Sequence, residues 1–109
     1  KKEKYKSAIS KFKKLINKKS DNYTQADIYN YLGYTHRKLM KYDDAETYYL
    51  KALKLDSDHV GALEYIGELY LETDRIEEAK KSLQKLKSVA GESSNEYLEL
   101  STLIKNYSQ

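Results

Sequence analysis

The sequence has 109 residues with 20 Lys and Arg against 17 Asp and Glu, a net charge of +3 at neutral pH. It has no Cys, which excludes disulfide bonds and thiolate chemistry, and no Pro or Trp, while 12 Tyr stand against one Phe. This composition predicts a single all-α domain over residues 1–109, and no apolar run is long enough to cross a membrane.

The first predicted helix, residues 4–18, is strongly basic. Residues 1–19 carry nine Lys and one Glu, so this segment has a charge of +8 and the rest of the chain −5. Because the chain begins at Lys1 without a Met, we expect that something upstream of it has been removed. The apolar residues of the helix recur at helical spacing, and the lysines fall between them: Tyr5, Ala8, Ile9, Phe12, Leu15 and Ile16.

A turn over residues 20–25 separates this helix from the next, which we expect over residues 25–40 with Thr24 as its cap. A third helix is predicted over residues 43–55. Gly33 and Ala45 are small, so we expect these two helices to touch there, and a larger side chain would cost roughly 1–3 kcal/mol of overpacking strain.

Three more helices follow the turn at residues 56–58. They are predicted over residues 60–72, over residues 76–89 and from about residue 94 to Tyr107. The patterns predict Asp74 with Glu77 as a capping pair, Gly91 at a helix C-terminus, and Ser93 with Glu96 as a capping box of the last helix.

The chain repeats itself with a period of 34 residues. A shift of 34 keeps the size class at seven apolar or small positions, and a shift of 37 relates the first helix to the third. The seven residues are Tyr29, Leu32, Gly33, His36, Tyr42, Ala45 and Tyr49, which fall on Leu63, Ile66, Gly67, Tyr70, Ile76, Ala79 and Leu83.

This pattern resembles the tetratricopeptide repeat family over essentially the whole chain. The resemblance implies a right-handed α-solenoid of about six antiparallel helices. Its parts are the second half of a truncated repeat at residues 1–22, repeats at 26–59 and 60–93, and a capping helix at 94–109.

A narrower resemblance concerns small bacterial members of the family. The runs NYLGYTHRKL, GALEYIGELYL and EYLEL are similar to that group, whose members often carry an export signal. Members of the group frequently have two Cys in the stretch that corresponds to Val89–Ser94, and this chain has none there. The resemblance implies an exported, periplasmic location, with a cytoplasmic one as the alternative.

Family members bind extended or helical peptide segments in a concave groove lined by the first helix of each repeat. The resemblance therefore implies a non-enzymatic protein-interaction module. Residues spaced by three or four share a helix face, which gives the groove stripe of each first helix. By position these residues are Asp27, Asn30, Tyr34 and Arg37, then Gly61, Glu64, Glu68 and Leu71, then Asn95, Leu98, Thr102 and Lys105.

The charges of this stripe indicate the kind of ligand. Some family members hold a partner's C-terminal carboxylate with Lys, Asn and Arg, but Glu64 and Glu68 occupy two of those positions here and would repel it. We therefore expect a basic or neutral segment, with Asn30 bonded to its backbone and Tyr34 stacked on a side chain. The alternative is a solvated face on which Arg37 pairs with one of the glutamates.

Other candidate groups have structural interpretations beside functional ones. Tyr31 and Tyr65 form either an aromatic groove wall or a seam between neighbouring helices, and the seam is favoured. His36 falls where the family usually has Tyr and is expected to be a half-buried core residue, while His59 lies at a turn. No spacing of His, Cys or acidic residues predicts a metal site, a cofactor or a catalytic group.

Two further functions stay open. The chain could assemble with copies of itself through its open solenoid ends, either the first helix, with Tyr5, Phe12 and Ile16 as the contact, or the C-terminal capping helix. Its lysines could instead bind nucleic acid or an anionic membrane. The absence of aromatic interleaving favours a solvated helix face over a nucleic-acid site.

Overall fold

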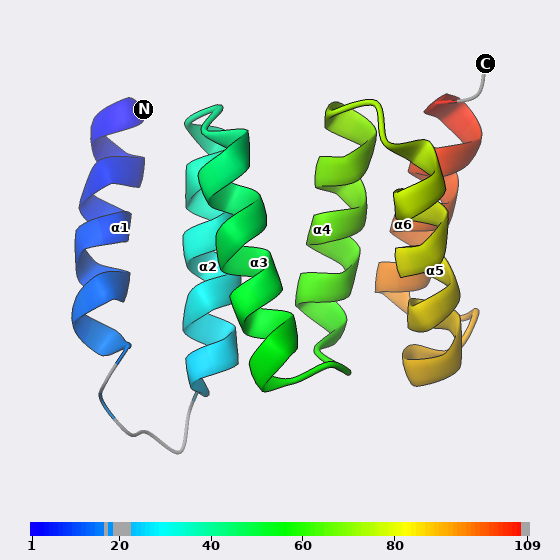
Figure 1. Cartoon of the computed structure of the whole chain (residues 1–109), viewed down its shortest axis with the longest axis horizontal. Helices are drawn as coiled ribbons and strands as arrows, with labels where there is room; N and C mark the ends of the chain where they lie inside the picture. Colours follow the sequence, from blue (N-terminus) through cyan, green and yellow to red (C-terminus); the bar gives the residue numbers. More distant parts are fainter. Residues whose placement is uncertain (17, 19–22, 108–109) are drawn as a thin grey trace. The chain divides into compact units, whose positions relative to one another are not determined.

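The computed structural model describes residues 1–16, 18 and 23–107. Over these residues the chain is all α-helical, without strands, as the sequence predicts (Figure 1). None of the described helices is both long and apolar enough to span a bilayer. The helices are α1 (Lys2–Leu15), α2 (Gln25–Lys38), α3 (Tyr42–Leu55), α4 (Val60–Glu72), α5 (Ile76–Ala90) and α6 (Asn95–Tyr107).

The first of two compact units, Lys1–Ser57, contains α1, α2 and α3. Helix α2 packs against α3 on one side and α1 on the other. No residue of α1 is buried, and its Phe12 ring stacks on Tyr31 of α2 with centroids 5.3 Å apart. The core of this first unit lies between α2 and α3 and consists of Ala26, Ile28, Leu32, Ala45, Tyr49 and Ala52.

The second unit, Asp58–Gln109, contains α4, α5 and α6. Each of these helices packs against both of the others. Burial of apolar side chains between them stabilises the unit at about 25 cal/mol per Å². Its core residues are Ala62, Leu63, Ile66, Leu69, Leu71, Ala79, Leu86, Leu100 and Ile104.

Two glycines related by the 34-residue period lie at the closest helix contacts. A Cβ placed on Gly33 would lie 2.5 Å from Cδ1 of Tyr49 in α3. A Cβ placed on Gly67 would lie 2.5 Å from Cδ2 of Leu100 in α6. Both positions therefore need a residue without a side chain, and the predicted contact of Gly33 with α3 is made through Tyr49.

The turns inside the two repeats have the same backbone geometry. Met40 and Asp74, which are 34 residues apart, have φ angles of 62° and 59°. In each turn the next residue donates its N–H to a carbonyl five residues back, from Lys41 to His36 at 2.9 Å and from Arg75 to Tyr70 at 2.7 Å. This left-handed closure satisfies helix-end carbonyl groups and turns the chain into the second helix.

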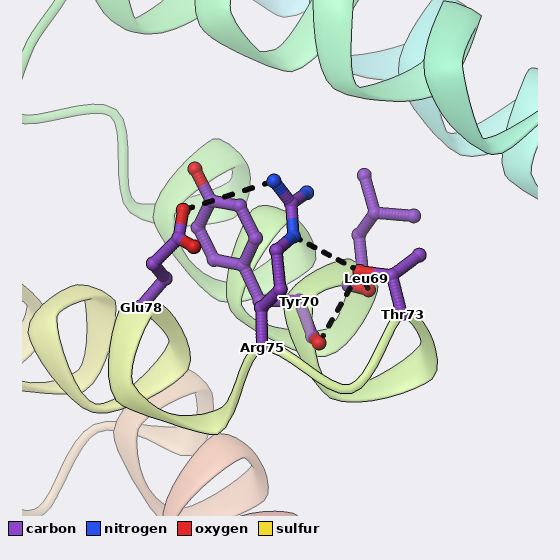
Figure 2. A network of polar contacts seen from close by, with 5 residues as sticks. All are labelled: Leu69, Tyr70, Thr73, Arg75 and Glu78. Atoms are coloured by element: carbon purple, nitrogen blue, oxygen red, sulfur yellow. Dashed lines mark hydrogen bonds and ion pairs between the residues drawn. The ribbon is translucent and has the colours of Figure 1, made fainter.

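A polar network fixes the α4–α5 turn (Figure 2). Arg75 donates its Nε–H to Oγ1 of Thr73 at 3.2 Å, and Oγ1 of Thr73 donates to the carbonyl of Leu69 at 2.9 Å. The Arg75 guanidinium also lies 4.6 Å from the Tyr70 ring centroid and 3.8 Å from Oε2 of Glu78. One arginine thereby links the end of α4 to the start of α5.

The helix caps agree with the sequence in part. Thr24 and Asp27 form a capping box on α2, so the predicted Thr24 cap is confirmed. Gly91 ends α5 with φ 88°, as predicted. At α4 the cap is His59, whose Nδ1 accepts the N–H of Ala62 at 3.0 Å, a role that the sequence analysis did not assign.

Two predicted caps are wrong. Helix α5 has no side-chain cap, because Asp74 is in the left-handed turn and its carboxylate accepts the hydroxyl of Tyr107 instead. At α6 the hydroxyl of Ser94, not Ser93, accepts the N–H of Tyr97 at 3.1 Å. Helix α1 also runs earlier than predicted and ends at Leu15, and residues 20–22 of the predicted turn lie outside the described residues.

We expect Gly33→Ala to lower the free energy of unfolding by about 1 kcal/mol. Overpacking against the buried Tyr49 ring costs roughly 1–3 kcal/mol, and the better helix propensity of Ala offsets about 1 kcal/mol of it. Urea unfolding measures the change. In a Tyr49→Leu background the same substitution is expected to cost less, and an equal cost in both backgrounds would contradict the contact.

We expect Met40→Gly to raise the free energy of unfolding by up to about 1 kcal/mol, because glycine adopts the left-handed conformation without strain. The Met40 side chain is 72% exposed, so its removal forfeits little packing. Met40→Ala is the control, since alanine keeps the strain. A shift of the urea midpoint that is the same for both variants would argue against strain at this turn.

Candidate functional site

The α2 part of the groove stripe is more buried than a binding surface requires. Asp27 is partly exposed, and its Oδ2 accepts the Thr24 N–H at 2.9 Å, so it serves the helix cap. Asn30 is 6% exposed and Arg37 is 9% exposed. Oδ1 of Asn30 accepts no hydrogen bond from the described residues, which costs about 1–3 kcal/mol for a buried acceptor.

Tyr34 is the member of this stripe with ring surface left for a ligand. The ring is partly exposed, and two cations of the same helix lie over it. Arg37 is 5.7 Å and Nζ of Lys38 is 5.2 Å from its centroid. Such contacts are worth about 0.5–1 kcal/mol at exposed sites, so the ring has a measurable affinity for cations.

In the second unit, four glutamates form a carboxyl cluster on α4 and α6: Glu64, Glu68, Glu96 and Glu99. Glu64 and Glu68 are one helical turn apart, partly buried, and joined by a side-chain hydrogen bond. Burial, that hydrogen bond and the negative charges of the other three glutamates raise the pKa of Glu64 to about 8. At neutral pH Glu64 therefore keeps its proton.

Helical spacing identifies only two of the four glutamates in the carboxyl cluster. It places Glu64 and Glu68 in the groove stripe, but not Glu96 and Glu99. These two lie next to the stripe positions Asn95 and Leu98 on α6. The described residues contain no group of three or more acidic, His or Cys side chains with a geometry suited to a metal ion.

The remaining stripe positions differ in exposure. Leu71 at the end of α4 is buried, and Gly61 at its start is partly exposed. On α6 the side chain of Leu98 is 51% exposed, and Thr102 and Lys105 are exposed. Helix α6 therefore adds an apolar group, a hydroxyl and a cation to the accessible surface of the second unit.

The histidines have structural contacts. His36 is buried, with Nδ1 2.7 Å from the carbonyl oxygen of Leu32 and its ring 4.8 Å from that of Tyr48. His59 caps α4. Among the tyrosines, Tyr31 is 49% exposed and stacks on Phe12 of α1, and Tyr65 is partly exposed.

Comparison with known families agrees with the repeat geometry. Residues 26–59 and residues 62–93 each match a family profile described as "Tetratricopeptide repeat". The chain belongs to the tetratricopeptide repeat family. Repeats of this family generally mediate protein–protein interactions, and their fold is typically non-catalytic.

The chain is similar to parts of two longer proteins. The chain is 32% identical over 77 residues to human "Protein O-mannosyl-transferase TMTC2", a match that covers 71% of the chain and 9% of that protein. It is 33% identical over 78 residues to "Uncharacterized protein ycf37" of Guillardia theta, covering 70% of the chain and 44% of the relative. The match thus spans less than half of each relative.

We expect Glu64→Gln to stabilise the protein more at pH 9 than at pH 4.5. The folded-state pKa of Glu64 is about 8, above the unfolded value of 4.5, so its ionisation makes folding less favourable as pH rises through this window. The neutral amide does not ionise, so the variant keeps the free energy of unfolding that the original chain loses as pH rises. This difference is about 1 kcal/mol or less after allowance for solvent screening.

The measurement is urea unfolding of both proteins at pH 4.5, 7 and 9. Glu78→Gln on α5 is the control, because Glu78 is exposed and forms an ion pair with Arg75. A gain from Glu64→Gln that does not change with pH would mean that Glu64 titrates normally.

Proposed function

We propose that this chain is a non-enzymatic interaction module that binds a peptide or protein segment, basic or neutral, on the first-helix surface of its repeats. The carboxyl cluster on α4 and α6 is the observation that carries the ligand preference. Burial, the hydrogen bond with Glu68 and the negative charges of Glu68, Glu96 and Glu99 raise the pKa of Glu64 to about 8, so a positive charge beside Glu64 would offset this repulsion. A ligand cation would supply that charge.

Arginine suits this cluster better than other side chains. Its planar guanidinium donates two parallel hydrogen bonds to a carboxylate and stays protonated at any physiological pH. At neutral pH, a guanidinium beside Glu64 favours the ionised form of this carboxyl group and displaces its proton. Binding of an arginine peptide is therefore expected to release a proton below about pH 8.

Exposed groups of α6 suit an extended segment. Leu98 offers an apolar contact and Thr102 a hydroxyl. The non-enzymatic part of the proposal is supported by the family's typically non-catalytic fold and by the structural contacts of both histidines.

The test is fluorescence anisotropy with a labelled, end-blocked peptide Ala-Ala-Arg-Ala-Arg-Ala-Ala. We expect the double variant Glu64→Gln, Glu68→Gln to bind it at least tenfold more weakly, because both carboxylates that face the arginine are neutralised. A tenfold loss corresponds to about 1.4 kcal/mol. For the original chain, affinity is expected to increase between pH 6 and pH 9.

The matched control is Glu77→Gln, Glu78→Gln on α5, which replaces two exposed glutamates outside the carboxyl cluster. If both double variants lose affinity equally, the peptide responds to overall charge and the proposed site is wrong. A peptide with Glu in place of Arg is expected not to bind.

Self-association through α1 is a second candidate. None of the 14 residues of α1 is buried, and Tyr5, Phe12 and Ile16 keep part of their surface. Sedimentation velocity at increasing protein concentration distinguishes it: growth in size that a Tyr5→Ser variant abolishes would favour assembly, and a monomer at high concentration would exclude it.

A further inference from the structure

A hollow of about 340 Å³ lies in the first unit, between the start of α2 and the end of α3, which run side by side in Figure 1. An adjoining hollow of about 380 Å³ shares two of its residues and includes Asp56. Neither hollow contains a residue of the groove stripe. The first is lined by Gln25, Tyr29, Lys51, Lys54 and Leu55.

The ring of Tyr29 lines the hollow and packs against aromatic side chains that lie outside its lining. The rings of Tyr29 and Tyr48 stack with centroids 6.1 Å apart, and the buried His36 ring supports Tyr48 from the other helix. Nζ of Lys51 lies 5.6 Å from the centroid of each tyrosine ring. These two contacts favour one position of the Lys51 ammonium, on the wall of the hollow.

Two lysines of α3 give this hollow a positive charge. Neither Lys51 nor Lys54 forms an ion pair within the described residues, whereas other lysines such as Lys80, Lys85 and Lys87 each pair with a carboxylate. Two ammonium groups on one helix, one turn apart, repel each other, and an anion between them relieves that repulsion.

Apolar surface lies beside these charges. Leu55 is 54% exposed, and the Tyr29 ring forms part of the wall. Gln25 is oriented by donating its Nε2–H to the carbonyl oxygen of Ile16 at 2.9 Å, so this wall is fixed. The hollow combines a rigid aromatic face, an exposed aliphatic side chain and two cations, which is the composition of a small-ligand pocket.

We propose that this hollow is a second binding site, for a monoanion with one carboxylate on an aromatic or aliphatic group. The carboxylate lies between the ammonium groups of Lys51 and Lys54, and the apolar group lies against Tyr29 and Leu55. The volume holds about a dozen non-hydrogen atoms at the density of a liquid. Asp56 in the adjoining hollow disfavours polyanions such as nucleic acid.

The test is an NMR titration of the ¹⁵N-labelled chain with 3-phenylpropionate, and with its amide as the uncharged analogue. We expect saturable shifts of the amide signals of the five lining residues, and at least tenfold weaker binding of the amide. A peptide, acetyl-Gly-Phe-Asp-Gly-amide, forms a second arm. Tighter binding of the peptide would identify a protein side chain as the source of the carboxylate, and tighter binding of the free acid a small molecule.

Paired variants assign the effect to this hollow. Lys51→Gln, Lys54→Gln is expected to weaken binding at least tenfold, and Lys51→Arg, Lys54→Arg to retain it. Lys11→Gln, Lys14→Gln is the matched control, since it removes two exposed lysines at the same spacing from α1. All these positions are exposed, and circular dichroism verifies the fold.

Three results would overturn the proposal: no saturable shifts up to 20 mM of either probe, equal binding of acid and amide, or equal loss in both glutamine double variants. The proposed site shares no residue with the groove stripe. We therefore expect the double variant Glu64→Gln, Glu68→Gln to bind 3-phenylpropionate as tightly as the original chain does.

Discussion

Close approach of two helices at a residue without a side chain is the constraint on which each unit depends. At Gly33 the absent Cβ makes room for the Tyr49 ring, and at the equivalent Gly67 it makes room for Leu100. The same repeat position therefore contacts α3, the second helix of its own repeat, in the first unit, and α6, the last helix, in the second unit. Buried side chains are packed at crystal-like density, so neither glycine tolerates a larger residue without displacement of its neighbour.

The helices were predictable from the sequence because their apolar residues repeat, and two of the caps were not. An N-cap needs an extended backbone, but Asp74 has to adopt φ 59° to close the end of α4. The N-cap position of α5 falls on Arg75, whose side chain has no hydrogen-bond acceptor, so α5 begins without a side-chain cap. At α6, Ser93 has the capping-box spacing to Glu96. The helix nevertheless begins at Asn95, so Ser94 is the residue before it and accepts the N–H of Tyr97.

The candidate site shows a similar division. Helical spacing placed Glu64 and Glu68 on one face, which is a local property of α4. Glu96 and Glu99 act on Glu64 because α6 packs against α4, and that contact depends on tertiary structure. Burial of Asn30 and Arg37 could not be read from spacing either, since it depends on what surrounds α2. Sequence periodicity thus identifies a face, and packing decides which of its residues remain accessible.

The chain separates two kinds of unbalanced charge. On α4 and α6, carboxyl groups repel one another and Glu64 retains a proton near neutral pH. On α3, Lys51 lies over two tyrosine rings, and neither Lys51 nor Lys54 has a carboxylate partner among the described residues. Either arrangement costs stability unless an external ion of opposite sign binds. Both lie next to exposed apolar groups, Leu98 in one unit and Leu55 in the other. An ion that carries an apolar group would gain burial and charge pairing at the same place, which is more selective than either alone.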